Sequence, residues 1–143
     1  MIDANVLLVD DEKAFVETMA KRLKKRKLVI SKAFTGEEAL EHIHVHPKVE
    51  VVILDVKMPG MNGREVLKEI KKHYPLIEVI MLTGHATVES GIEGMKLGAF
   101  DYLTKPCDID NLIAKVDEAA IKKRRHEEKI IDARLKEITS RRA

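Results

Sequence analysis

The sequence predicts an α/β fold, in which a doubly wound parallel sheet of five strands carries helices on both faces and the last helix is extended. The first observation behind this prediction is a set of short, wholly apolar runs such as NVLLV and VVIL. Strands of this kind suit a parallel sheet that is buried on both faces. The second observation is that longer stretches with apolar residues at helical spacing lie between these runs. A repeat of this kind makes right-handed crossovers, which place helices on both sides of one sheet.

Five strands and five helices are expected in alternation. The expected strands, the second and fifth of which have the weaker patterns, are Asn5–Val9, Val29–Ala33, Val51–Leu54, Val79–Leu82 and Tyr102–Leu103. The expected helices, each with one apolar face, are Ala14–Leu23, Glu37–Ile43, Arg64–Lys72, Val88–Leu97 and Ile109–Ala120. Glycine or proline lies near several of these helix ends, at Gly36, Gly63, Pro75 and Gly98.

The last helix is expected to continue past Ala120, because no proline or glycine follows and helix-forming residues do. A break near Arg124–Glu127 is an open alternative. Residues 122–143 hold nine basic and four acidic residues, a net charge of +5, which leaves −3 for residues 1–121. We therefore divide the chain into a body, residues 1–121, and a basic helical extension, residues 122–143.

The composition is that of a folded protein, with 45% hydrophobic and 35% charged residues. No apolar run approaches the ~20 residues of a membrane span. The N-terminus lacks the basic start and small-residue cleavage site of a signal peptide. Cys107 is the single cysteine, which excludes an internal disulfide and fits a reducing compartment. We expect a cytoplasmic protein that makes no membrane contact.

Reactive side chains follow four of the expected strands. Asp10 and Asp11 follow the first strand, Asp55 follows the third, Thr83 ends the fourth and Lys105 follows the fifth. The carboxyl ends of parallel strands form one rim, which is where doubly wound sheets place their sites. Three clustered carboxylates repel one another and need a counter-charge, for which Mg²⁺ is suited. With a lysine opposite, they would stabilise a phosphoryl group that arrives on a carboxylate.

Each of these residues also has an ordinary structural explanation. Asp10 or Asp11 alone could cap a helix, and Asp55 could start a turn. Thr83 could simply favour a strand, and Lys105 could be a solvated charge. Because four such coincidences at the right strand ends are improbable together, we favour the functional interpretation.

Four motifs, in order, resemble a known family. They are DD after the first strand, ILDVKMPGMNG at the third, TGHA at the fourth and YLTKP at the fifth. Together they resemble the receiver domain of bacterial response regulators, the CheY-like superfamily. The resemblance covers about residues 3–121 and implies a flavodoxin-like fold that binds Mg²⁺.

The resemblance implies a phosphoacceptor and a set of metal ligands. Asp55 matches the phosphoacceptor. Asp11 and Asp55 match the direct Mg²⁺ ligands, with the backbone carbonyl of Lys57 as a third. Asp10 matches the acidic position that holds metal-bound water.

The resemblance also implies a switch. Lys105 matches the lysine that pairs with a phosphoryl oxygen. Thr83 matches the hydroxyl that turns toward the phosphoryl group. Tyr102 matches the aromatic residue that swings inward when Thr83 moves, although a lone aromatic residue near a strand is more often part of the core.

The implied function is that of a two-component response regulator in phosphorelay signal transduction. A histidine kinase or a histidine phosphotransfer protein would phosphorylate Asp55, and the modified domain would change a face that binds a downstream protein. Activity beyond self-phosphotransfer and slow autodephosphorylation is not expected.

Three alternatives remain. The TGHA motif with a long last helix also resembles the receiver portion of DNA-binding transcriptional regulators of the sigma-54 type. A metal-dependent phosphatase with Asp55 as nucleophile usually carries a second aspartate where Lys57 lies. An interaction domain that works without phosphorylation would not need the intact acidic set.

Several polar residues fall outside this set. His42, His44 and His46 alternate in HIHVHP, and the first and last have the i, i+4 spacing of metal ligands. We expect solvated histidines there, because a proline follows and the helix end frays. Lys57 and His85 lie two residues beyond Asp55 and Thr83, and we hypothesise that they shield or guide the water that hydrolyses the acyl phosphate.

The extension has apolar residues but no sustained heptad. The large apolar residues are Ile121, directly before the extension, and Ile130, Ile131, Leu135 and Ile138 within it, and charged residues interrupt any single seam between them. A homodimer is open, through this helix or through the face of the fourth and fifth helices. Direct binding of nucleic acid is not expected, because acidic residues are interspersed and aromatic residues are lacking.

Overall fold

In the computed structural model, which describes residues 3–84 and 86–142, parallel strands form one five-stranded sheet in the order β2–β1–β3–β4–β5. The strands are β1 (Asn5–Val9), β2 (Val29–Ala33), β3 (Val51–Leu54), β4 (Glu78–Thr83) and β5 (Asp101–Thr104). The helices are α1 (Lys13–Lys24), α2 (Gly36–Val45), α3 (Gly63–His73), α4 (Val88–Lys96) and α5 (Ile109–Arg142). The strand order reverses between β1 and β3, which is the position where doubly wound sheets bind ligands.

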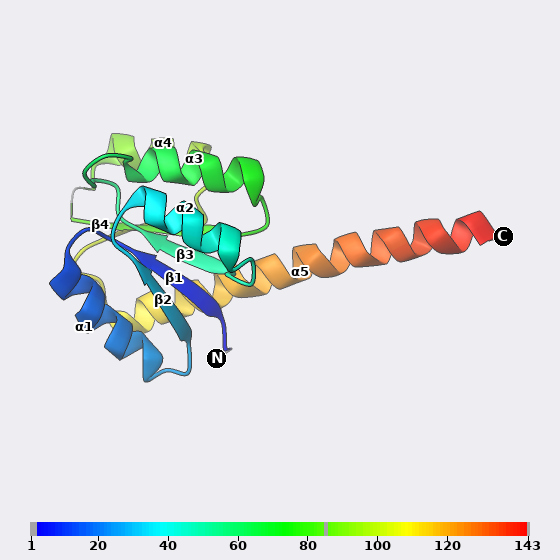
Figure 1. The fold of residues 1–143 in the computed structure, drawn as a ribbon, viewed down its shortest axis with the longest axis horizontal. Helices are drawn as coiled ribbons and strands as arrows, with labels where there is room; N and C mark the ends of the chain where they lie inside the picture. Colours follow the sequence, from blue (N-terminus) through cyan, green and yellow to red (C-terminus); the bar gives the residue numbers. More distant parts are fainter. Residues whose placement is uncertain (1–2, 85, 143) are drawn as a thin grey trace.

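The sheet is covered on both faces (Figure 1). Helices α1 and α5 lie on one face, and α2, α3 and α4 lie on the other. Adjacent strand residues divide between the two cores, so that Leu8 and Ile53 pack toward α1 and α5 while Leu7 and Leu54 pack toward α2 and α3. This double coverage explains why β1, β3 and β4 are apolar almost throughout.

The predicted fold class is confirmed, and the differences are confined to element ends. Strand β4 begins at Glu78, one residue before the apolar run, and β5 reaches one residue further at each end than predicted. Helix α5 continues without a break through the Arg124–Glu127 region, where charged residues form an i, i+4 pair, Lys123 to Glu127, at 2.6 Å.

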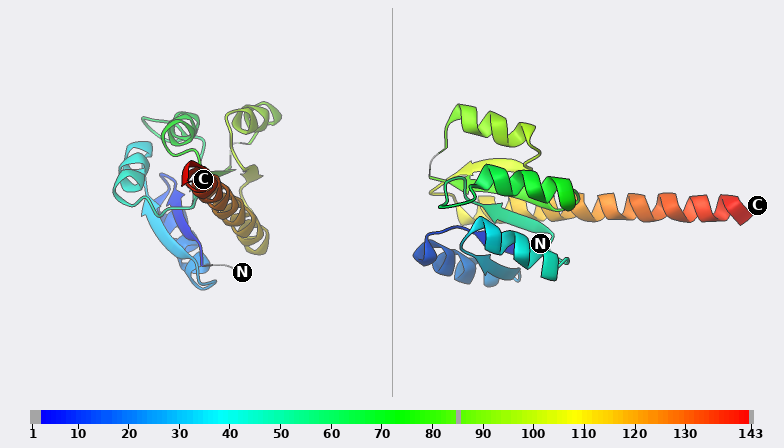
Figure 2. Two further views of the ribbon diagram at one scale, coloured as in Figure 1. Left: turned by 90° about the vertical axis from the view of Figure 1, so that its right-hand side faces the viewer. Right: turned by 45° about the horizontal axis from the view of Figure 1, so that its top comes forward.

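Helix α5 has two parts with different surroundings. Residues up to Ala120 pack on the sheet, and Leu112, Val116 and Ala120 are buried there. Its last turns project alone (Figure 2), and the apolar residues there, Ile131, Leu135 and Ile138, are exposed. No helix in the described part of the chain is long and apolar enough to cross a membrane.

Candidate phosphoacceptor and metal site

Three carboxylates and one lysine meet at the carboxyl rim of the sheet. Carboxylate oxygens of Asp10, Asp11 and Asp55 all lie within 4.8 Å of one another. Asp10 and Asp55 are buried, with 1% and 4% of their surface exposed, whereas Asp11 is exposed. The Lys105 Nζ lies 2.5 Å from Asp10 Oδ2. One lysine opposes three carboxylates, so this set of hard oxygen donors fits a further cation such as Mg²⁺.

The surroundings of Asp55 do not fully compensate the negative charge of its carboxylate. Burial raises the pKa of the Asp55 carboxyl above its usual range, and the nearby Asp10 charge raises it further. A hydrogen bond from Thr83, the charge of Lys105 and the Val56 N–H, which donates to Asp55 Oδ1 at 2.8 Å, oppose this shift without cancelling it. The ionised form of Asp55 therefore gains from any cation that binds beside it.

Lys105 is held between acidic groups and an aromatic ring. Its Nζ lies 3.4 Å from Glu12 Oε1 and 4.1 Å from the centroid of the Phe15 ring. Burial acts to lower the pKa of Lys105, but the hydrogen bond and charge of Asp10, with the charges of Asp55 and Glu12, raise it overall. The ammonium group is thus kept charged and pointed at the rim; the peptide bond that follows it, to Pro106, is cis.

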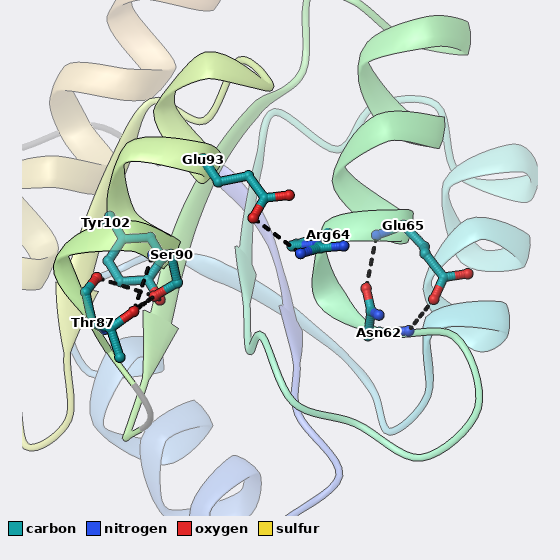
Figure 3. Close-up of polar contacts among 7 residues, drawn as sticks. All are labelled: Asn62, Arg64, Glu65, Thr87, Ser90, Glu93 and Tyr102. Carbon is teal, nitrogen blue, oxygen red and sulfur yellow. Dashed lines mark hydrogen bonds and ion pairs between the residues drawn. The ribbon is translucent and has the colours of Figure 1, made fainter.

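The chain after Asp55 forms the wall of an open pocket of about 510 Å³ that includes Asp11, Asp55, Lys57 and Asn62. Asn62 begins α3 through a capping box with Glu65, in which each side chain accepts from the other's backbone N–H (Figure 3). This cap fixes the direction in which the chain returns from the pocket.

Gly63 permits the return to pass close to the phosphoacceptor position. Its N–H donates to the Val56 carbonyl at 2.8 Å. A Cβ on Gly63 would lie 2.1 Å from the Asp55 carbonyl oxygen. Only glycine fits this contact, which ties the start of α3 to the backbone of Asp55.

The two predicted switch residues lie on adjacent strands, β4 and β5. Thr83 is fully buried at the end of β4, and its side chain hydrogen-bonds Asp55. Tyr102 is half-buried on β5 and packs against α4, with its hydroxyl 2.7 Å from Ser90 Oγ (Figure 3).

The remaining predicted polar residues lie away from this site or outside the described residues. The rings of His42 and His46 lie 4.5 Å apart, and burial followed by the charge of His46 lowers the pKa of His42. Among the described residues, the only cluster of three or more potential metal-ligating side chains is the aspartate cluster at the rim. His85 lies outside the described residues. Burial, followed by the charge of Asp108, raises the pKa of the half-buried Cys107 thiol.

Four contributors were not identified from the sequence. Glu12 and Phe15 contact Lys105, and Thr87 with Ser90 forms the α4 cap that contacts Tyr102. The T-x-x-S spacing before α4 resembles a capping box and could have indicated the cap. No sequence signal indicates that the capping serine reaches a tyrosine on β5.

The part of the chain that carries this site matches a known protein family. The family model described as the response regulator receiver domain matches residues 6–117. That segment contains the aspartate cluster, the switch pair and Lys105.

Relatives and solved structures agree with this match. The chain is 40% identical over 116 residues to the uncharacterized transcriptional regulatory protein YesN of Bacillus subtilis. The aligned residues cover 79% of this chain and 31% of YesN. It is 39% identical over 121 residues to a putative NtrX-like response regulator of Rickettsia typhi, covering 83% of this chain and 25% of that protein.

Among solved structures, a receiver domain protein from Clostridium thermocellum matches with a TM-score of 0.81 at 34% identity, covering 85% of this chain and 97% of that one. The chain spans about a quarter to a third of the length of the two curated relatives. These matches and the rim geometry coincide, and the chain belongs to the response regulator receiver domain family.

Proposed function

We propose that the chain accepts a phosphoryl group on Asp55 from a histidine kinase or a histidine phosphotransfer protein, with Mg²⁺ bound at the rim, and thereby switches a protein-binding face. The observation that carries the proposal is the meeting of Asp10, Asp11, Asp55 and Lys105 at the switch point of the sheet. The family match supports it.

The chemistry follows from the positions of the side chains. A carboxylate oxygen of Asp55 attacks the phosphorus, an oxygen–phosphorus bond forms, the bond from phosphorus to the donor's imidazole nitrogen breaks, and that nitrogen takes up a proton. Lys105 pairs with a phosphoryl oxygen, and Thr83 turns toward another. Asp11, Asp55 and the Lys57 carbonyl would hold Mg²⁺ directly and Asp10 would hold its water; when bound, the ion neutralises charge on the transferring group.

Intact-mass measurement after incubation with acetyl phosphate and Mg²⁺ tests this proposal. We expect one added phosphoryl group on the wild type and none on Asp55→Asn. Asp132→Asn is a matched control, because it makes the same chemical change on the exposed extension. An adduct on Asp55→Asn, or no adduct on the wild type, would refute the assignment of Asp55.

The proposed output is a protein contact by a chain that stays in the cytoplasm. Helix α4 exposes an apolar face, including Val88 with 80% of its surface exposed, and the basic extension (residues 122–143) exposes Ile131 and Leu135. Either surface could bind a downstream protein or a second copy of the chain. Light scattering with and without acetyl phosphate would show whether the chain dimerises.

A second candidate is the receiver portion of a transcriptional regulator. The chain is 35% identical to residues that make up 24% of the DNA-binding transcriptional regulator NtrC of Escherichia coli. In that case α5 would lead toward further domains, and Asp55 would keep the same role.

A further inference from the structure

Helix α4 holds Tyr102 by both its ring and its hydroxyl group (Figure 3). The ring lies against a face of α4 formed by Gly91 and Gly94. A Cβ on Gly91 would be 3.6 Å from Tyr102 Cδ1, and a Cβ on Gly94 would be 3.3 Å from Cδ2. The absence of side chains at these two positions lets the ring approach the helix closely. The hydroxyl oxygen lies 2.7 Å from Ser90 Oγ.

Ser90 Oγ has several hydrogen-bonding groups of Thr87 around it. It lies 3.0 Å from the Thr87 backbone nitrogen, 3.0 Å from Thr87 Oγ1 and 3.1 Å from the Thr87 carbonyl oxygen. A hydroxyl group can both donate and accept. In the pair with Tyr102 either hydroxyl can be the donor. Ser90 thus caps α4 and hydrogen-bonds Tyr102 with the same oxygen.

Tyr102 lies on the strand next to the one that carries the hydroxyl partner of Asp55. Thr83, which hydrogen-bonds Asp55, ends β4, and β4 pairs with β5 so that Thr83 is in register with Thr104 and Met81 with Tyr102. A movement of Thr83 toward a phosphoryl group therefore occurs beside the strand that carries Tyr102. Tyr102 cannot leave its place on α4 without giving up the bond to Ser90.

We propose that Ser90 is a positioning residue that holds Tyr102 against α4 in the unphosphorylated protein and so sets how readily the switch occurs. This inference rests on the proposed function, because it takes Tyr102 as part of the switch. A single neutral hydrogen bond of this kind shifts a two-state equilibrium by about two- to tenfold. Its removal shifts the protein by that factor toward the state in which Tyr102 has left α4.

The position of Tyr102 can be read without phosphorylation. The chain has two tyrosines, Tyr74 and Tyr102, so nuclear magnetic resonance of ring-labelled tyrosine gives one signal to test and one internal control. We expect Ser90→Ala to move the Tyr102 signal and leave that of Tyr74 in place. Ser90→Thr, which keeps a hydroxyl, should restore the wild-type signal.

A variant of the cap separates this role from a purely structural one. Thr87→Ala removes Thr87 Oγ1, which accepts from the Ser90 N–H at 3.0 Å and lies 3.0 Å from Ser90 Oγ, but it keeps the Ser90 hydroxyl that bonds Tyr102. We expect it to lower the melting temperature without moving the Tyr102 signal. A wild-type Tyr102 signal in Ser90→Ala, or the same displacement in Thr87→Ala, would overturn the inference.

The initial rate of modification by acetyl phosphate tests the regulatory part. Ser90→Ala and Tyr102→Phe should each raise the rate by about two- to tenfold, and the double variant should raise it no further, because both remove the same bond. Unchanged rates in both single variants would overturn this part. A wild type that takes up no phosphoryl group would refute the proposed function, while the ring signals would still decide whether Ser90 holds Tyr102.

Discussion

Replacement of Gly63 by alanine should damage the phosphoacceptor site through the backbone. The added Cβ would lie 2.1 Å from the Asp55 carbonyl oxygen and 2.8 Å from Val56 Cα. Because a Cβ essentially never lies closer than 3.0 Å to such an atom, the start of α3 and the backbone of Asp55 must separate by about 1 Å. The obstructing atoms are backbone and cannot rotate away.

The magnitude follows from two opposing effects. Overpacking of this kind costs up to ~3 kcal/mol, and alanine recovers at most about 1 kcal/mol of helix propensity. The net loss of about 2 kcal/mol in the free energy of unfolding corresponds to a fall of roughly 6 °C in melting temperature for a domain of this size. A displacement of ~1 Å at the reacting carboxylate lowers the rate of its modification by about 100-fold.

Thermal unfolding and the rate of acetyl phosphate modification would measure both effects. Gly84→Ala is the matched control, because a Cβ on Gly84 meets no atom within 4 Å and the residue also lies at the rim. If Gly63→Ala melted within 1 °C of the wild type and were modified at the wild-type rate, the role assigned to the close approach of α3 would be refuted.

Four further predictions concern the metal site, the pair of Arg124 and Glu50, and the lifetime of the acyl phosphate. Saturating Mg²⁺ should stabilise the wild type by about 2.7 kcal/mol at a concentration 100 times its Kd, and Asp11→Asn should lose most of this gain in a thermal titration. Arg124→Gln should cost about 1 kcal/mol of unfolding free energy, because it leaves the buried Glu50 without its main partner. The cost is no larger because Arg124 is 40% exposed and water screens the pair. Arg125→Gln, on the exposed side of the helix, should cost nothing measurable. Burial acts to raise the pKa of Glu50, but Arg124 and the other donors lower it below its ordinary value near 4.5. The stability that the ionised Glu50 contributes is therefore present above that pH and is lost as the pH falls through the pKa of the folded state. This loss should be smaller in Arg124→Gln. If side chains border the approach of water, Lys57→Ala should change the decay rate of the phosphorylated protein, and an unchanged rate would remove that hypothesis.

The sequence alone predicts the rim of this domain well, and the reason is physical. Asp55 and Thr83 directly follow or end apolar runs, and parallel strands bring their carboxyl ends to one edge. Lys105 follows the weakest strand, Tyr102–Leu103, and its placement depended on motif order as much as on pattern. The structure brings Lys105 within 2.5 Å of Asp10.

Contacts between side chains far apart in the sequence were not predictable in this way. Periodicity shows which face of α4 is apolar but not that Ser90 reaches Tyr102. The sequence likewise shows that the extension is basic but not which of its residues bind the rest of the domain. Arg124 in fact binds Glu50, 74 residues away, through two hydrogen bonds of 2.7 and 3.0 Å, and no local pattern marks such a pair.

The opposite rim of the sheet explains why that pair exists. Glu50 and Glu78 precede the apolar residues of β3 and β4, and both carboxylates are buried. A buried carboxylate needs counter-charges. Glu50 receives them from Arg124, and Glu78 from Lys71 at 2.9 Å and from Lys122 at 3.1 Å.

Strands β3 and β4 therefore carry charged or polar groups at both ends. Asp55 and Thr83 lie at the carboxyl rim, and the carboxylates of Glu50 and Glu78 bind the first residues of the extension at the amino rim. Because each strand is packed on both faces, it transmits a displacement along its length with little compression. The root of the extension is thus attached to the same two strands that carry the phosphoacceptor position and its hydroxyl partner, which makes the direction of α5 a property of the folded domain.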